Sequence, residues 1–195
     1  MRKLILGGSF NPIHHGHLAC SRAVAEAMGF DRITLIPTAQ SPHKPESASM
    51  ADSAHRIAML RVAIAGDASF EVDELELSRT GPSYTIDTVG ELAARGESPI
   101  HWLIGADMLI YLPRWHRIDE LLTQVNFIIM ARPDCPIDWS QLPAKFQYLK
   151  SEVVAAPLIS ISATDIRARV ARGLSIRYLT PDSVCDYIDR NGLYR

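Results

Sequence analysis

The chain has 195 residues, and its 20 basic and 22 acidic side chains give a formal net charge of −2 with histidine counted as neutral. With 47% hydrophobic and 22% charged residues, the composition excludes an intrinsically disordered protein, which needs fewer apolar residues and a larger net charge. The near-neutral balance gives no general attraction to nucleic acid or to a membrane surface, so any phosphate chemistry must depend on a few local cations.

The cysteines and the apolar runs indicate the compartment. Cys20, Cys135 and Cys185 are an odd number with wide spacing, which fits neither a disulfide framework nor a zinc site and indicates a reducing environment. The apolar run at residues 3–6 is ended by two glycines, short of a signal-peptide core, and no stretch approaches the ~18 apolar residues that span a bilayer. We therefore expect a cytoplasmic protein without a membrane or nucleic-acid partner, and the sequence leaves formation of a homo-oligomer open.

The first 37 residues predict a strand, a helix and a second strand. Residues 3–6 are a short apolar strand, and residues 17–28 have apolar side chains spaced by three or four, with Gly29 as a helix stop. Residues 33–36 are apolar and mostly β-branched. A strand, a helix and a strand in this order predict a βαβ unit with parallel strands.

The middle of the chain continues the alternation. Residues 38–49 are rich in Pro, Ser, His and Lys without periodicity and predict a long loop of the kind that is functional or mobile. Residues 52–65 predict a helix with Ile57, Leu60 and Ile64 on one face, and residues 70–72 predict a short strand.

Further helices and strands follow in the second half. Thr85 is expected to cap a helix that ends at Gly96, and residues 100–104 and 127–130 predict buried strands on either side of a helical stretch around residues 119–122.

The C-terminal third changes to helical periodicity. Beyond Val153 and Val154, helices are predicted at residues 164–172 and 181–189, the second with Thr180 as its cap and proline at its first position. The whole pattern predicts a single α/β domain over residues 1–195: a Rossmann-like, doubly wound parallel sheet with helices on both faces and a helical C-terminal segment.

The strongest functional signal is the segment Gly-Gly-Ser-Phe-Asn-Pro-Ile-His-His-Gly-His at residues 7–17. It joins the first strand to the first helix, where the carboxyl ends of parallel strands and a helix N-terminus favour binding of phosphate. His14 and His17 add imidazole N–H donors there; either alone is an ordinary surface or capping histidine, but together they predict a phosphate site. The segment matches neither a P-loop nor a dinucleotide-binding fingerprint.

A second anion site is predicted near the start of the C-terminal helices. Ser162 and Asp165 have the spacing of a capping box, and a capped helix whose first turns present Ser162 and Arg167 is a second place for a phosphate. Other residues have ordinary interpretations from composition alone: Trp115 as packing and Lys44 as a solvated lysine.

Asp107 can be interpreted simply as a helix cap after the strand at residues 100–104. The sequence does not rank Arg79 and Arg132 as further phosphate partners.

Two motifs resemble those of the nucleotidyltransferase superfamily, whose members transfer AMP or CMP to phosphate acceptors. The pattern G-x-F-x-P-x-H-x-G-H is matched by Gly8, Phe10, Pro12, His14, Gly16 and His17, and I-S-x-T-x-x-R by Ile161, Ser162, Thr164 and Arg167. Further stretches, together covering essentially the whole chain, resemble bacterial nicotinate-nucleotide adenylyltransferases: residues 41–45, 81–88, 105–107, 112–115 and 191–195. Two positions depart from the commonest family wording: Asn11 stands where aspartate is frequent, and Ala163 replaces a serine.

The resemblance implies transfer of AMP from ATP to nicotinate mononucleotide, which gives nicotinate adenine dinucleotide and pyrophosphate. It implies that the ATP phosphates are held by Gly8, Ser9, Phe10, His14, His17, Ser162 and Arg167, with Lys44 reaching in from the long loop. By the same resemblance Gly105 and Asp107 lie by the adenosine, and Thr85 and Trp115 hold the nicotinate.

The residues contain no activated nucleophile, so direct in-line attack is expected. Mg²⁺ is then carried in on ATP rather than held by a metal site of the protein. The alternatives are another adenylyltransferase of the superfamily, such as phosphopantetheine adenylyltransferase, and a nucleotide-sensing module without turnover.

Overall fold

The computed structural model describes residues 1–42, 50–131 and 137–195. Its centre is a six-stranded sheet in which all neighbours are parallel, in the order β3-β2-β1-β4-β5-β6. The strands are β1 (Lys3–Gly8), β2 (Arg32–Pro37), β3 (Phe70–Val72), β4 (Ile100–Gly105), β5 (Val125–Ala131) and β6 (Val153–Ala155). The predicted parallel α/β sheet is confirmed, with each predicted strand lying inside an observed one.

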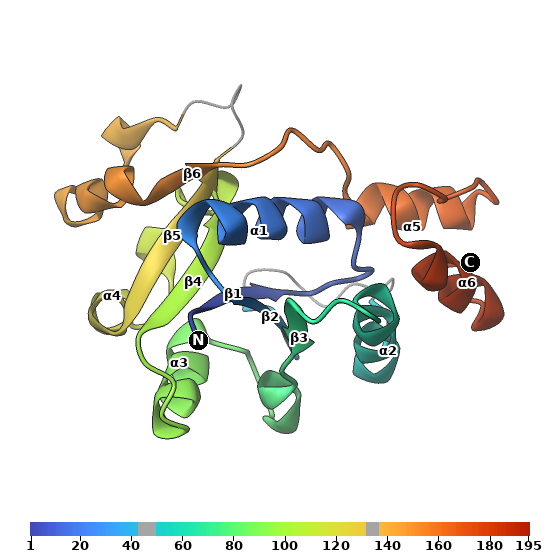
Figure 1. The fold of residues 1–195 in the computed structure, drawn as a ribbon, viewed down its shortest axis with the longest axis horizontal. Coiled ribbons are helices and arrows are strands. Elements are labelled where there is room, and N and C mark those ends of the chain that lie inside the picture. Colours follow the sequence, from blue (N-terminus) through green and yellow to red (C-terminus); the bar gives the residue numbers. More distant parts are fainter. Residues whose placement is uncertain (43–49, 132–136) are drawn as a thin grey trace.

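The connections between strands are helical (Figure 1). The α-helices are α1 (His15–Met28), α2 (Ser53–Ala63), α3 (Thr85–Ala94), α4 (Ile118–Gln124), α5 (Ala163–Ala171) and α6 (Asp182–Arg190). Short 3₁₀ helices add η1 (Leu75–Ser78), η2 (Ala106–Met108), η3 (Leu112–Arg114), η4 (Trp139–Gln141) and η5 (Ala144–Glu152). No helix in these described ranges is long and apolar enough to cross a membrane.

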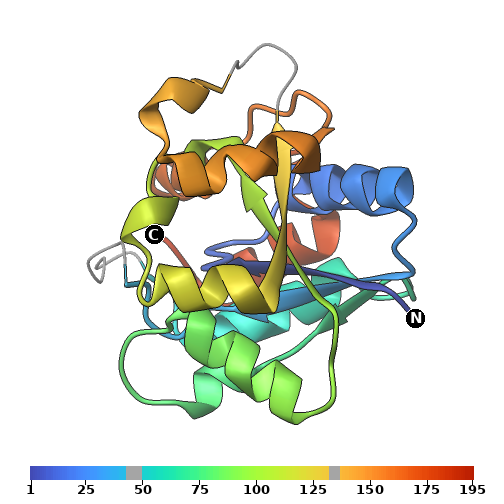
Figure 2. The same ribbon diagram turned by 90° about the vertical axis from the view of Figure 1, so that its left-hand side faces the viewer.

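Alternate strand residues bury against two separate helical layers, as the pleat of a sheet requires. Leu4 and Leu6 of β1 pack in one core with α1, α2, α5 and α6, whereas Ile5 packs in the other with α3, α4 and η5. Figure 2 shows α1 on one side of the sheet and α3 and α4 on the other. Both faces of the sheet are therefore covered, which explains why its strands are continuous apolar runs.

Helices α5 and α6 lie past the carboxyl end of β1, beside α2, rather than flat on a face of the sheet (Figure 1). Helix α6 packs against α2. The prediction that Thr180 caps α6 is wrong: Pro181 occupies the cap position, and the buried Thr180 hydroxyl donates instead to the Ile13 carbonyl at 2.7 Å. This bond ties α6 to the loop that precedes α1.

The predicted apolar face of the second helix is also partly wrong. The buried side chains of α2 are Arg56, Met59 and Leu60, while Ile57 is only half-buried. The buried face of α2 is rotated relative to the predicted one because the helix packs on both the sheet and α6. A buried arginine, Arg56, occupies one of the inward positions of the helix.

The strand order reverses between β1 and β4, because β1, β2 and β3 run outward to one edge of the sheet and β4, β5 and β6 to the other. Register pairs Ile5 with Trp102, so Gly8 and Gly105 end neighbouring strands at the same level. In an open parallel sheet, ligands bind beyond the carboxyl ends of the strands at such a reversal. The fold thus brings the loops after β1 and β4 together at one end.

Candidate active site

The loop between β1 and α1 is tightly constrained. Gly8 ends β1, and its carbonyl accepts a hydrogen bond from the Thr38 amide at 2.9 Å. Phe10 follows at φ 45°, a left-handed conformation that is rare for a bulky residue, with its ring buried. The Asn11–Pro12 peptide is cis. The chain therefore turns sharply from the strand into α1 within a few residues.

His14 and His17 lie together at the start of α1. Their rings stack with centroids 3.7 Å apart, and the His14 amide donates to Nδ1 of His17 at 3.3 Å. A Cβ at Gly16 would stand 3.0 Å from the His14 ring, so the glycine leaves room for this stack. The Phe10 ring meets His17 edge-on at 5.2 Å. The predicted pairing of the two histidines at a helix start is observed.

His14 is electrically neutral at physiological pH. The residue is only 6% exposed, and Nδ1 is buried without a hydrogen-bond partner. Burial lowers the pKa of His14 to about 4, and the neighbouring His15 acts in the same direction. An imidazole in this state can donate one N–H and accept at its other nitrogen, and it carries no charge of its own.

The amides at the start of α1 are mostly used within the protein. His15 donates to the Leu179 carbonyl, and His17 and Leu18 donate to the His14 carbonyl. The helix N-terminus therefore offers fewer backbone donors than the sequence suggests, and the imidazoles carry more of the polar character of this site.

The second predicted motif lies against the same loop. Ser162 caps α5, and its hydroxyl accepts from the Asp165 amide at 3.0 Å, which confirms the predicted cap. Nη1 of Arg167 donates to the Asn11 carbonyl at 2.8 Å, across 156 positions of sequence. The side chain of Asn11 accepts from the Ala51 amide at 3.0 Å and the Tyr194 hydroxyl at 2.7 Å. Asn11 therefore joins the loop to the segment before α2, to α5 and to the segment after α6.

Gly105 and Asp107 stand at the end of β4, beside the loop that follows β1. Asp107 is exposed in the three-residue 3₁₀ helix η2, and its side chain does not cap that helix. Its carboxylate lies where a Cβ on Gly105 would be, so the glycine leaves space for it. The alternative interpretation of Asp107 as a helix cap is wrong because Gly105 holds the cap position.

The two residues predicted to hold nicotinate lie on the face of the sheet that is covered by α3, α4 and η5. The prediction that Thr85 caps α3 is wrong, because Thr85 is the first residue of the helix and Tyr84 holds the cap position. The Tyr84 ring stacks on His116, with the ring centroids 4.3 Å apart. Trp115 follows η3, and its half-buried ring meets Phe127 edge-on at 6.0 Å.

The sequence offered three basic residues, Lys44, Arg79 and Arg132, as possible phosphate partners. Lys44 and Arg132 lie outside the described residues. Arg79 donates to Glu91 at 2.8 Å and to the Thr88 hydroxyl at 2.7 Å, so it is committed to α3.

Arg56, which sequence reasoning missed, reaches the loop instead, with Nη1 2.9 Å from the Ser9 carbonyl. The available signal was an arginine at helical spacing from Met59 and Leu60, on the inward face of α2.

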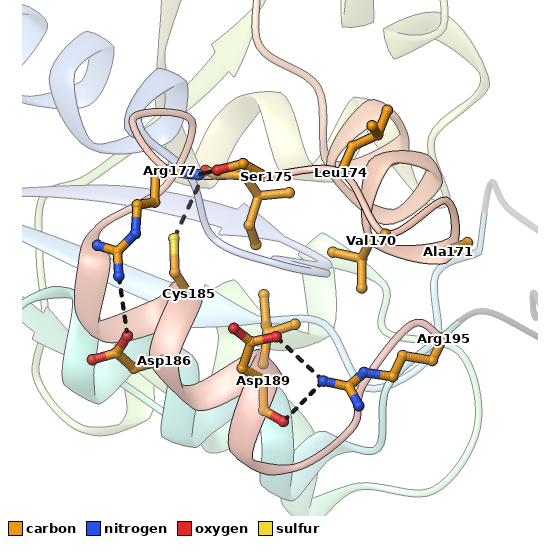
Figure 3. A pocket seen from close by; sticks show the side chains of 12 residues that line it. Val170, Ala171, Leu174, Ser175, Arg177, Cys185, Asp186, Asp189 and Arg195 are labelled. Carbon is orange, nitrogen blue, oxygen red and sulfur yellow. Dashed lines mark hydrogen bonds and ion pairs between the residues drawn. The ribbon is translucent and has the colours of Figure 1, made fainter.

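A separate hollow of about 650 Å³ lies between α5 and α6 (Figure 3). Apolar side chains such as Val170 and Ile188 line it, and its charged side chains pair with one another: Arg195 lies 3.3 Å from Asp189. None of the predicted site residues is among those that line it. No group of three or more His, Cys, Asp or Glu in the described part of the chain is arranged to hold a metal ion.

Comparisons with known proteins identify relatives along the whole chain. Residues 5–169 match the model of the family described as cytidylyltransferase-like. A protein of Roseiflexus sp. (strain RS-1), named "Probable nicotinate-nucleotide adenylyltransferase", is 42% identical over 98% of this chain and 96% of its own length. One of the same name from Enterococcus faecalis (strain ATCC 700802 / V583) is 41% identical over 98% of this chain and 84% of its own.

Solved structures share the fold. That of a nicotinic acid mononucleotide adenylyltransferase from Plasmodium falciparum, complexed with NaAD, superposes with a TM-score of 0.75 at 21% identity, covering 100% of this chain and 98% of the other.

Proposed function

This chain belongs to the cytidylyltransferase-like family and, within it, to the nicotinate-nucleotide adenylyltransferases, and we propose that it transfers AMP from ATP to nicotinate mononucleotide, forming nicotinate adenine dinucleotide and pyrophosphate. One observation carries the assignment of the site. The two phosphate motifs, 156 positions apart, meet at the reversal of strand order through the bond between Arg167 and the Asn11 carbonyl. A single polyphosphate can lie across both.

The loop after β1 is proposed to receive the phosphates of ATP. His14 and His17 donate imidazole N–H groups to the phosphate oxygens, and the backbone of Gly8, Ser9 and Phe10 shapes the turn on which they rest. A neutral His14 suits this role because it can be buried without a counter-ion before substrate arrives. An arriving phosphate would then favour its protonated form.

The motif on α5 is proposed to hold the other end of the phosphate chain. The amides of Ala163 and Thr164 begin α5 after the Ser162 cap, so they face outward as donors for an anion. Arg167 lies against the loop through Asn11 and provides charge beside it. Lys44 is proposed as a further phosphate contact, on the family resemblance alone.

The loops after β4 and before α3 are proposed to hold the two ring systems. Gly105 and Asp107 lie by the adenosine. Thr85 begins α3, where the amides of Asp87 and Thr88 donate to the Tyr84 carbonyl but those of Thr85 and Ile86 lie ahead of the helical ladder. These two amides are suited to the carboxylate of nicotinate, while Trp115 offers a ring face.

The chemistry requires no covalent intermediate. An oxygen of the acceptor phosphate attacks the α-phosphorus of ATP in line, a phosphorus–oxygen bond to pyrophosphate breaks, and the leaving group takes the electron pair. The acceptor phosphate is already anionic, so no general base is needed. The protein positions the groups and stabilises the charge, and Mg²⁺ enters as part of the MgATP substrate.

Pyrophosphate release with a panel of acceptors tests this function. The purified protein with MgATP should release pyrophosphate with nicotinate mononucleotide and give a product with the mass of nicotinate adenine dinucleotide. Phosphopantetheine and a reaction without acceptor are the controls. Turnover with phosphopantetheine alone would identify the other transferase, and ATP binding without turnover on any acceptor would identify a binding module.

A further inference from the structure

Arg56 of α2 is buried directly behind the phosphate loop. It is only 2% exposed, and its guanidinium group donates to three backbone carbonyls of three different segments. Nη1 lies 2.9 Å from the Ser9 carbonyl and 2.8 Å from that of Thr38, and Nε lies 3.2 Å from that of Ala51. A planar fork of donors can hold three carbonyls at fixed relative positions, which a single point charge cannot do.

The positive charge of Arg56 has no carboxylate within ion-pair distance among the described residues. The nearby phenol of Tyr194 does not compensate it, because burial raises the pKa of Tyr194 and its hydroxyl donates to Asn11. Asn11 itself is neutral. Burial lowers the pKa of Arg56, yet a guanidinium group remains protonated in proteins.

A buried charge is normally paired, and carbonyl dipoles alone balance this one only in part. Since the described residues supply no anion to pair with it, the phosphates of a bound substrate are a group that can complete the balance. The turn that Arg56 holds by the Ser9 carbonyl is the turn proposed above to receive the phosphates of ATP.

We infer that Arg56 is a positioning residue for adenylyl transfer, which fixes the phosphate loop through the Ser9 carbonyl and supplies a buried positive charge whose counter-ion is the substrate's polyphosphate. This inference rests on the proposed function. It assigns two separable roles to one side chain: the charge favours binding of the polyphosphate, and the fork geometry aligns the loop for the reaction.

Two variants separate these roles. In Arg56→Lys the charge stays but the fork is lost, so kcat should fall about tenfold while the KM for ATP changes less than about threefold. In Arg56→Gln both are lost, so the KM for ATP should also rise by about tenfold. Arg61→Gln is the matched control: Arg61 lies on the same helix, is exposed and pairs with Glu74, so its removal should leave both constants unchanged.

A binding measurement independent of turnover completes the test. Inorganic pyrophosphate should raise the melting temperature of the wild type and of Arg56→Lys similarly, and that of Arg56→Gln distinctly less. Wild-type kinetics and pyrophosphate response in folded Arg56→Gln would overturn the inference. If Arg56→Gln does not fold, Arg56→Lys decides: an unchanged kcat, or failure of this variant to fold as well, would make Arg56 purely structural. A wild type that releases no pyrophosphate would contradict the proposed function instead.

Discussion

The loop after β1 and the loops after β4 face the same site but are built differently. Side chains from α2, α5 and the segment after α6 hydrogen-bond to the first loop, through Arg56, Arg167 and Tyr194. The loops after β4 contain the short 3₁₀ helices η2 and η3, where Leu109 and Leu112 are buried but Ile110 and Tyr111 between them are 52% and 48% exposed. The side proposed for phosphate chemistry is thus fixed by side chains from distant segments before substrate arrives, whereas on the side proposed for the adenosine the exposed side chains have room to adjust.

The largest contrast between the two sides should appear in turnover. His17→Ala removes a fixed donor from the phosphate side, and by analogy with losing one preorganised oxyanion donor kcat should fall about 10² to 10³-fold, or ~3 to 4 kcal/mol. Circular dichroism and thermal melting should show an intact fold. A fully active His17→Ala would remove the chemical role assigned to the phosphate side.

Protonation of His14 should make the phosphate side sensitive to acid. Its pKa is about 4 in the folded protein and ordinarily 6.5, so the unfolded chain takes up the proton first as pH falls. The contribution of His14 to the free energy of unfolding is therefore fully present above pH 6.5. It is lost as the pH falls from about 6.5 to 4, and the loss amounts to up to about 3 kcal/mol.

Urea unfolding of wild type and His14→Gln across this range measures that contribution. The difference in unfolding free energy between the two proteins should shrink toward pH 4. A constant difference would mean that His14 is not held neutral by the fold.

Substitution of a glycine on the phosphate side and of one on the adenosine side compares how tightly the two sides are packed. A Cβ at Gly7 would stand 2.8 Å from Cζ2 of the buried Trp102, and overpacking of this kind costs about 1–3 kcal/mol. A Cβ at Gly105 would meet the side chain of exposed Asp107, which can rotate away, so Gly105→Ala should cost less than about 0.5 kcal/mol. Urea midpoints for both variants check this, and equal losses would contradict the contrast.

Acceptor choice concerns the pyridine end of the site. The amides that begin α3 can both pair with a carboxylate, whereas a nicotinamide would turn its NH₂ toward a donor at a cost of ~1 to 3 kcal/mol. We expect kcat/KM for nicotinate mononucleotide to exceed that for nicotinamide mononucleotide at least roughly tenfold. Trp115→Ala should lower both values in parallel. Equal efficiency of the two acceptors would show that the start of α3 does not select the acid.

Local patterns in the sequence were enough to predict the sheet and the motif after β1. Short apolar runs identify every strand except the edge strand β6, and the position of His14 and His17 between a strand and a helix depends only on neighbours in sequence. The caps were harder: Thr85 and Thr180 are good capping residues, yet tertiary contacts shift each boundary by one residue and give the Thr180 hydroxyl another partner.

Contacts between distant segments could not be predicted. Helical spacing from Met59 and Leu60 places Arg56, unlike the exposed Arg61, on the inward face of α2, but the sequence does not show that the Ser9 and Thr38 carbonyls lie there after folding. The meeting of Arg167 with Asn11 likewise depends on where α5 packs, although the motif that contains Arg167 is visible in the sequence.

The bond between the Tyr194 hydroxyl and Asn11 has a consequence for folding order. It joins residues 183 positions apart, so it is among the most non-local contacts that this chain can form, and such contacts are slow to form because closing a long loop costs entropy first. During synthesis β1, α1 and β2 emerge early, but Asn11 obtains this partner only after residue 194 has been added. A nascent chain can therefore form the Arg56 contacts of its phosphate loop early, but it lacks those of Arg167 and Tyr194 until the last part of the chain has been made.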